Sequence, residues 1–352
     1  MNEIKNNVIN DDVLFASLKK CKNGVLYKSS AAFCYLHGMT QIIRLKDQLE
    51  DGTYKPRKAK VFEITHPKHR TIVSIAFRDR VYQRALNDII VYPKMTKQFI
   101  YDNAACQKNK GTDFARERLI YFLRDCYRKN GPESYVLKAD IKGYYNNMSH
   151  DLAKEKFREK LDDWTYGEVV KIIDGQYSGE VGFNPGSQMI QILGISMLSK
   201  VDHFIKERLR IKYYLRYQDD FILIHPDKNY LEYCRAELEK ELGKIGLKFN
   251  VKKTKIQKTS NKLEFLGFDF HITKTGKVVM NVTGDKVKEK KRHFRKMVAK
   301  CKRGEIPRYK VDESFESTMN HYNKGNSEEL IRRMRQFYKS LWKEQDNGTR
   351  NN

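Results

Sequence analysis

Three aspartates at the ends of apolar segments constrain this chain more than any other feature. Asp140 lies at the exit of a strand-like run over 134–141, and Asp219 and Asp220 lie at the polar tip of a hairpin expected over 211–224. Carboxylates in such places lose hydration and repel one another, so a cluster of them is stable only where cations neutralise it. Because hard oxygen donors suit Mg²⁺, the pattern indicates a magnesium site. The alternative is a plain polar hairpin turn.

A pair of such metal ions has a defined chemical use. Two cations about 3.5 to 4 Å apart clamp the attacking and leaving oxygens of an in-line phosphoryl displacement. Nucleotidyl transfer is a reaction of this kind. The three acids therefore point to phosphoryl transfer if they meet in space.

The overall charge indicates a polyanionic partner. The 352 residues include 69 Lys and Arg against 44 Asp and Glu, for a formal net charge of +25. Basic residues spread along the whole chain can neutralise many phosphates, so we expect nucleic-acid binding that weakens steeply with salt. The alternative is a basic protein that is merely soluble.

Cysteine usage and hydropathy bear on the cellular location. The six cysteines form no Cys-x-x-Cys pair, and the chain starts without an apolar signal segment. It contains no continuous apolar run of about 18 residues, the length that a membrane span needs. We therefore expect reduced cysteines, a cytoplasmic location and no membrane partner.

Apolar periodicity predicts the order of helices and strands. Helices are expected over 11–49, 78–90, 113–129, 228–245 and 327–342, and a basic helical segment begins after 283. Strands are expected in a hairpin over 60–75, at 134–141, in the hairpin over 211–224 and in short pieces over 246–270. Because the strands and helices do not alternate regularly, the predicted fold class is α+β.

From about 53 to 283 the chain resembles a bacterial reverse transcriptase, and the motifs stand in the order of that family. They are Lys68-x-Arg70-x-Ile72, Phe77 to Leu86, Asn103 to Thr112, Asp140-Ile-x-x-Tyr-Tyr145, Gly186-x-x-x-Ile-Gln191, Tyr217-Gln-Asp-Asp220, Asn250-x-Lys-Lys-Thr-Lys255 and Phe265-Leu-Gly-Phe268. The Asn-Ala-Ala-Cys-Gln string that ends at Gln107 is similar to those of diversity-generating and phage-defence enzymes.

The resemblance implies a right-hand polymerase with fingers, palm and thumb, and with an antiparallel sheet in the palm. We expect a helical N-terminal extension at 1–52, a fingers and palm core at 53–283, a helical basic thumb at 284–343 and a disordered tail at 344–352. Core and thumb would use nearly the entire chain, so we expect no attached nuclease. The basic segment 286–303 would follow an RNA or RNA–DNA backbone, and the alternative is a solvated helix face.

The resemblance also implies the metal ligands. Asp140 and Asp219 would be the main ligands, with Asp220 close by and the backbone carbonyl of Ile141 as a further ligand. Two Mg²⁺ ions are expected, with Mn²⁺ as an alternative. Lys253 would protonate the pyrophosphate leaving group as a general acid.

Five residues are implied in binding the incoming nucleotide. Arg70 and Lys68 would hold its triphosphate, although an exposed hairpin face is the alternative. Tyr145 would lie under the sugar and exclude a 2′-hydroxyl, and its alternative is core packing beside Tyr144. The backbone of Ile141 would also take part in binding the nucleotide, and Gln191 would contact the nascent base pair.

Two further features concern the primer and the fidelity of synthesis. Leu266, Gly267 and Phe268 would form the primer grip, although a glycine in a strand is equally a bulge. Ile190 departs from the Ser or Thr usual in relatives, which bears on fidelity or template choice.

The implied activity is RNA-directed DNA synthesis, with a dedicated structured non-coding RNA as template and with deoxynucleotides as substrates. The DNA product and an accessory protein or a second copy of the chain are further expected partners. We favour a role in antiphage defence. A diversity-generating retroelement enzyme, untemplated or protein-primed synthesis, and a catalytically silent RNA-binding scaffold are the alternatives.

Overall fold

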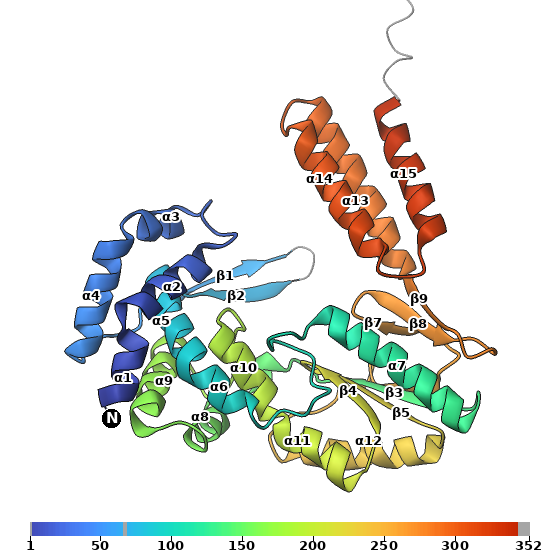
Figure 1. Ribbon diagram of the computed structural model, residues 1–352, viewed down its shortest axis with the longest axis horizontal. Coiled ribbons are helices and arrows are strands. Elements are labelled where there is room, and N and C mark those ends of the chain that lie inside the picture. Colours follow the sequence, from blue (N-terminus) through green and yellow to red (C-terminus); the bar gives the residue numbers. More distant parts are fainter. Residues whose placement is uncertain (1, 66–68, 344–352) are drawn as a thin grey trace, which may run out of the picture. The chain divides into compact units, whose positions relative to one another are not determined.

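The computed structural model describes residues 2–65 and 69–343 (Figure 1). They form two compact units. The first comprises Met1–Ala115, Leu137–Leu223 and Asn229–Lys255, and the second comprises Arg116–Val136, Ile224–Lys228 and Ile256–Asn352, each within the described residues. The predicted fingers and palm core at 53–283 is thus shared between both units, and the predicted tail at 344–352 lies outside the described residues.

Four helices open the first unit, and three of them lie in the segment of about 11–49 in which helices were predicted. They are α1 (Asn2–Ile9), α2 (Asp11–Lys22), α3 (Ser29–Leu36) and α4 (Gly38–Glu50). The side chain of Asn10 caps α2 by accepting a hydrogen bond of 2.9 Å from the backbone N–H of Asp12. Leu14 and Leu18, four residues apart, are both buried, as the helical spacing of apolar residues predicts.

A two-stranded hairpin follows, as predicted. β1 (Lys60–Ile64) pairs antiparallel with β2 (Arg70–Ser74), with Lys60 opposite Ser74 and Ile64 opposite Arg70. Apart from α12 (Lys228–Gly243), described below, the other helices of this unit are α5 (Phe77–Leu86), a π-helical turn (Asn87–Val91), α6 (Tyr92–Thr96), a 3-10 turn (Tyr145–Asn147), α8 (His150–Arg158), α9 (Asp163–Gln176), α10 (Gln188–Met197), α11 (Ser199–His203) and a second π-helical turn (Phe204–Arg208).

A four-stranded sheet carries the expected acidic residues. It contains β3 (Tyr135–Asp140), β4 (Tyr213–Tyr217), β5 (Asp220–His225) and β6 (Lys255–Lys258), in the order β4-β5-β3-β6. The apolar side chains of β3, β4 and β5 are buried, and helix α12 (Lys228–Gly243) follows β5. Together with the helices, this sheet confirms the α+β class.

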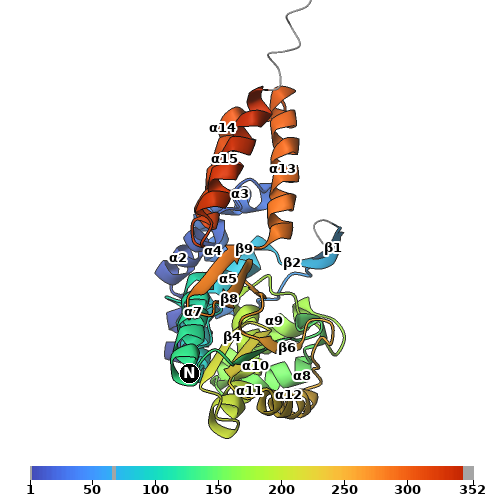
Figure 2. The ribbon, with the colours of Figure 1, turned by 90° about the vertical axis from the view of Figure 1, so that its right-hand side faces the viewer.

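The second unit holds most of helix α7 (Thr112–Asn130), an antiparallel sheet and three long helices. The sheet has the order β7 (Leu263–Phe265), β8 (Phe268–Ile272) and β9 (Val278–Val282), and the helices are α13 (Gly284–Lys302), α14 (Arg308–Tyr322) and α15 (Glu328–Lys343). The three helices lie side by side in both views (Figures 1 and 2). Phe294, Phe315 and Tyr338 hold them together, with ring centroids 5.3 Å apart for the first two and 4.0 Å for the last two.

Among the helices that the structure describes, none combines the length and the apolar character that a membrane crossing requires.

Candidate active site

β3 delivers Asp140 to the first unit, and a turn after Phe249 covers it. The backbone N–H of Asn250 donates to the carbonyl of Asp140 at 2.7 Å, and the Asn250 side chain donates to its carboxylate at 3.3 Å. The Lys253 Nζ lies 3.0 Å from Oδ1 and 3.1 Å from Oδ2 of Asp140. This hydrogen bond raises the pKa of the Lys253 ammonium, so the lysine is charged and neutralises Asp140.

The hairpin between β4 and β5 turns through only two residues, Gln218 and Asp219. Gln218 has a φ of 55°, a left-handed conformation that is unfavourable for a residue with a Cβ. The guanidinium of Arg216 donates to the Gln218 carbonyl at 2.8 Å and holds the turn. The strained turn therefore fixes the position of Asp219, which lies in it, and of Asp220, which follows it.

The three carboxylates influence one another electrostatically. Burial, together with the neighbouring Asp220 and Asp140 carboxylates, raises the pKa of Asp219 to about 6. The nearby Lys253 ammonium counteracts this effect only in part. The pocket thus holds more negative charge than its own lysine neutralises, which is the condition under which a bound cation is stabilising.

The donor set fits a hard divalent cation, although the acids are not gathered around a ready-made site. Across residues 2–65 and 69–343, no three His, Cys, Asp or Glu side chains stand in a geometry that would hold a metal ion. Lys253 forms an ion pair with Asp140 at 3.0 Å, and the metal-binding role of the three aspartates stays a prediction.

A buried ion pair behind the turn was not predicted from the sequence. Arg216 in β4 and Asp202 in α11 are both fully buried, and the guanidinium Nε donates to Asp202 Oδ1 at 2.7 Å. Tyr214 donates to the same oxygen at 2.6 Å, and a second guanidinium nitrogen donates to the Ile195 carbonyl at 3.0 Å. The feature of the sequence that could have indicated this ion pair is Arg216 itself, a single arginine within an otherwise apolar strand.

Tyr144 and Tyr145 have different environments. Tyr144 is buried and donates its hydroxyl to the carbonyl of Gly194. Tyr145 is half-buried, and its hydroxyl has no hydrogen-bond partner in the described part of the chain. A Cβ at Gly194 would lie 2.7 Å from the Tyr145 hydroxyl oxygen, so only glycine leaves room for this ring. Core packing thus describes Tyr144, and the nucleotide-facing role of Tyr145 remains a prediction.

Three motif segments that are distant in sequence meet beside the turn. The backbone N–H of Ala104 donates to the carbonyl of Arg216 at 2.9 Å, which places the preceding loop along β4. Cys106 then donates its thiol to the Gln191 side chain at 3.5 Å and accepts from the Gln218 side chain at 3.7 Å. The predicted substrate residue Gln191 therefore belongs to the same unit as the acids and contacts the segment next to them.

Some predicted residues cannot be assigned to this site. Lys68 lies outside the described residues, and only the backbone of Arg70 is described, at the start of β2. Ile141 is buried, and its backbone lies opposite Phe249 in an isolated antiparallel bridge. Ile190 is buried in α10, and its N–H donates to the capping side chain of Ser187 at 3.3 Å.

The predicted primer grip lies in the second unit. Leu266 and Gly267 form the two-residue turn between β7 and β8, with φ values of 47° and 89°. Gly267 is thus a turn residue and not a bulge within a strand. A Cβ at this glycine would lie 2.5 Å from the Lys286 Nζ. Phe268 is buried, and the Arg116 guanidinium lies 5.1 Å from the centre of its ring.

Comparisons with known proteins bear on the fold and the family of this chain. Protein YkfC of Escherichia coli (strain K12) is 24% identical over 296 residues, which make up 71% of this chain and 76% of that protein. The structure of telomerase from Candida albicans in complex with a TWJ fragment of telomeric RNA is similar with a TM-score of 0.53 and 14% identity. That similarity covers 82% of this chain, which spans only 55% of the telomerase chain. It confirms the right-hand polymerase fold.

A sequence-family comparison identifies the chain more closely. The family described as "Reverse transcriptase (RNA-dependent DNA polymerase)" matches residues 56–270. This range contains Asp140, the Tyr217-Gln-Asp-Asp220 hairpin, Lys253 and the Leu266-Gly267 turn. It also covers more than half of the 352 residues. The chain therefore belongs to the reverse transcriptase family.

Proposed function

We propose that this protein is an RNA-directed DNA polymerase that adds deoxynucleotides to a DNA strand by two-metal nucleotidyl transfer. The observation that carries the proposal is the placement of Asp140, Asp219 and Asp220 in one unit, where burial and the neighbouring Asp220 and Asp140 carboxylates raise the pKa of Asp219 to about 6. Such an arrangement of carboxylates favours binding of divalent cations. The family match over 56–270 supports the choice of reaction.

Asp140, Asp219 and Asp220 would hold two Mg²⁺ ions, with Mn²⁺ as a substitute and with the Ile141 carbonyl as a further ligand. The metals would activate the primer 3′-hydroxyl and stabilise charge on the transferred phosphorus. In this proposal the charged Lys253 leaves Asp140 and donates its proton to the pyrophosphate oxygen. Its exposed side chain supports this role, because 58% of that side chain is accessible to solvent.

The substrate residues follow from the same proposal. Arg70 and Lys68 would bind the triphosphate, Gln191 would contact the new base pair, and Tyr145 would exclude a 2′-hydroxyl. The half-buried Tyr145 ring, packed against Gly194, supports a rigid barrier to that hydroxyl. Leu266 and Gly267 would contact the primer through the turn that they form, and Phe268 would contact it from the start of β8.

An RNA strand would be the template, and we propose that it is a dedicated structured non-coding RNA. The formal charge of +25 and the exposed lysines and arginines of α13 support extended backbone binding. The four predicted segments, with fingers and palm at 53–283 and a thumb at 284–343, remain part of this proposal. An accessory protein or a second copy would complete the assembly.

Antiphage defence is the biological setting that we propose. Its support is the Asn-Ala-Ala-Cys-Gln string, in which Cys106 links Gln191 to the turn that carries the aspartates. Plaque formation on cells that express the protein with its native flanking RNA tests this setting. Protection by the wild type and not by Asp219→Asn is expected. Equal plaque numbers for both would contradict the defence role.

The test of the activity uses the protein with the RNA that it retains on purification. The RNA is sequenced, deoxynucleotides and Mg²⁺ or Mn²⁺ are added, and the DNA product is sequenced. We expect DNA complementary to the retained RNA, and none with Asp219→Asn. Product unrelated to any template would identify untemplated addition. If the protein makes no DNA product with either metal, the polymerase proposal is wrong, and the protein is a catalytically silent RNA-binding scaffold.

A further inference from the structure

A basic cavity lies in the first unit, between the N-terminal helices and the base of the β1–β2 hairpin. Its volume is about 900 Å³, within the range of small-molecule sites. Helices α3, α4 and α5, the segment 57–60 and the end of β2 contribute its wall. Its lining, as far as the structure describes it, contains no acidic side chain. Seven cationic side chains line it: Lys28, Arg44, Arg57, Lys58, Lys60, Arg78 and Arg80.

Most of these cations have no anionic partner among the residues that the structure describes. Arg78 is the exception, because it donates to the buried Asp79 carboxylate at 3.2 Å and to the Gln48 side chain at 2.9 Å. Within residues 2–65 and 69–343, the side chains of the other six form no ion pair. Asp79 also accepts the backbone N–H of Arg57 at 2.8 Å, so one buried acid positions two of the arginines.

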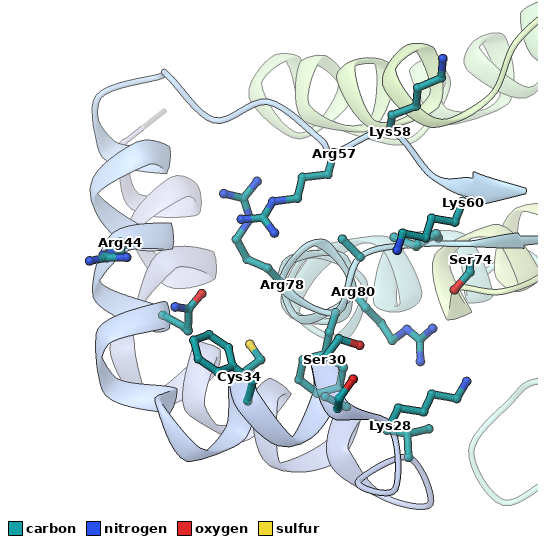
Figure 3. Close-up of a pocket in the computed structure, with 18 of the residues that line it drawn as sticks. Lys28, Ser30, Cys34, Arg44, Arg57, Lys58, Lys60, Ser74, Arg78 and Arg80 are labelled. Carbon is teal, nitrogen blue, oxygen red and sulfur yellow. The ribbon is translucent and has the colours of Figure 1, made fainter.

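Five of the lining cations lie in two groups on opposite sides of α5. In Figure 3, Lys28, Lys60 and Arg80 point into the same region on one side of α5, and the guanidinium groups of Arg57 and Arg78 lie near one another on the other side. The Arg80 Nε is buried and has no hydrogen-bond partner among the described residues. A buried unpaired donor of this kind is destabilising unless a ligand accepts from it.

Two helix starts add to the positive potential. α3 begins at Ser29 and α5 begins at Phe77, and both residues line the cavity. Neither helix has a side-chain cap at its N-terminus. Their first backbone N–H groups are therefore available to an anion, and the helix dipoles favour negative charge at the same place.

We propose that this cavity binds a compact polyphosphate group, such as the 5′-triphosphate end of an RNA strand or a free nucleoside triphosphate. Cations without an ion pair among the described residues line one cavity from several elements, so the cavity suits a ligand with several negative charges on adjacent groups. The exposed ring of Phe33 in the same wall offers a stacking surface for the attached base. This site is separate from the three aspartates, and the inference does not rest on polymerase activity.

The direct test is isothermal titration of the full-length protein with inorganic tripolyphosphate in EDTA. We expect one binding site. The double variant Arg57→Gln/Lys60→Gln should weaken binding about tenfold or more. The matched control Lys19→Gln/Lys160→Gln removes two other exposed cations of the first unit and should change binding less than about twofold. Arg70→Gln should also leave binding unchanged, which separates this cavity from the predicted nucleotide site.

Competition then identifies the source of the polyphosphate. Displacement by 5′-triphosphorylated RNA well below the concentration needed for ATP would identify a strand end, and equal displacement would identify a free nucleotide. Equal displacement by the same RNA with a 5′-hydroxyl would overturn the proposal, because an ordinary backbone would then suffice. Unchanged affinity in Arg57→Gln/Lys60→Gln, equal loss in the control, or no binding at all would also overturn it. Melting temperatures of the variants verify that each remains folded.

Discussion

The Lys253 Nζ lies 3.0 Å from Oδ1 of Asp140 and forms an ion pair with it at the edge of the candidate active site. The ammonium thus contacts the carboxylate that the proposed metals would use. Binding of a divalent cation and this ion pair therefore compete for the same oxygens. In the proposed reaction, the bound cation replaces Lys253 at the Asp140 carboxylate. The protonated lysine is then free when the leaving group needs a proton.

Replacement of Lys253 tests this relationship. Lys253→Gln removes the proton donor, so we expect the rate of nucleotide addition to fall by about 10² to 10⁴. Lys253→Arg can still pair with Asp140 but holds its proton too tightly to donate it, so its rate should also stay low. Single-turnover incorporation at saturating nucleotide is the measurement. Wild-type rates for Lys253→Gln would contradict the general-acid role.

Asp219→Asn should stabilise the metal-free protein while abolishing synthesis. The folded-state pKa of Asp219 is about 6, above its ordinary value of 3.8. A raised pKa means that the stabilising contribution is present below pH 4 and is lost as the pH rises through about 6. At pH 7 in EDTA the variant should therefore gain on the order of 1 to 3 kcal/mol in the free energy of unfolding.

Urea unfolding of the metal-free protein from pH 4 to pH 8 measures this gain. The difference between Asp219→Asn and wild type should be small at pH 4 and largest above pH 6. Asp47→Asn, at an exposed position on α4, is the control and should change stability by less than about 0.5 kcal/mol. A destabilising Asp219→Asn at pH 7 would show that the carboxylates do not repel one another as described.

Gly194→Ala should displace the Tyr145 ring. The new Cβ would lie 2.7 Å from the hydroxyl oxygen of Tyr145, so we expect a loss of about 1 to 3 kcal/mol in the free energy of unfolding. Tyr145→Ala removes the clashing ring, so Gly194→Ala should be nearly neutral in that background. A double-mutant cycle by thermal unfolding measures the coupling, and additive effects would show that the two residues do not contact.

Loss of one partner of the buried Asp202–Arg216 pair should be severe. Asp202→Ala leaves the guanidinium buried without its counter-ion, so we expect a loss of about 3 to 5 kcal/mol. Lys200→Ala breaks the exposed pair with Glu159, which spans 3.2 Å, and should lose less than about 1 kcal/mol. Chemical denaturation compares the two variants. A similar small loss in both would mean that the turn does not depend on this pair.

Local patterns in the sequence predicted most elements of the fold. Two apolar arms that flank a polar tip predicted the hairpin over 211–224, and helical spacing predicted α12 and α15, because each pattern is set by residues close in the chain. The order of motifs also identified Asp140 and Asp219, and the structure places both in the first unit.

Features that depend on distant packing were not predictable in this way. Nothing near Arg216 in sequence indicates that Asp202 neutralises it, since the pair forms only when α11 packs behind β4. The Lys253–Asp140 contact joins residues 113 positions apart. The basic cavity likewise collects residues from 25 to 80, and most of them lie outside the motif that begins at Phe77. Gly267 was expected either to approach the primer end or to form a bulge within a strand, and the pairing of Phe265 with Phe268 places it in a turn instead.

Primer extension on a defined RNA template tests the central claim most directly. The purified protein is given an annealed DNA primer, Mg²⁺ and one deoxynucleotide at a time, on two templates that differ only in the first unpaired base. The account predicts addition of the complementary deoxynucleotide on each template, and no addition by Asp219→Asn. Addition of the same nucleotide on both templates, or addition that persists in Asp219→Asn, would contradict it.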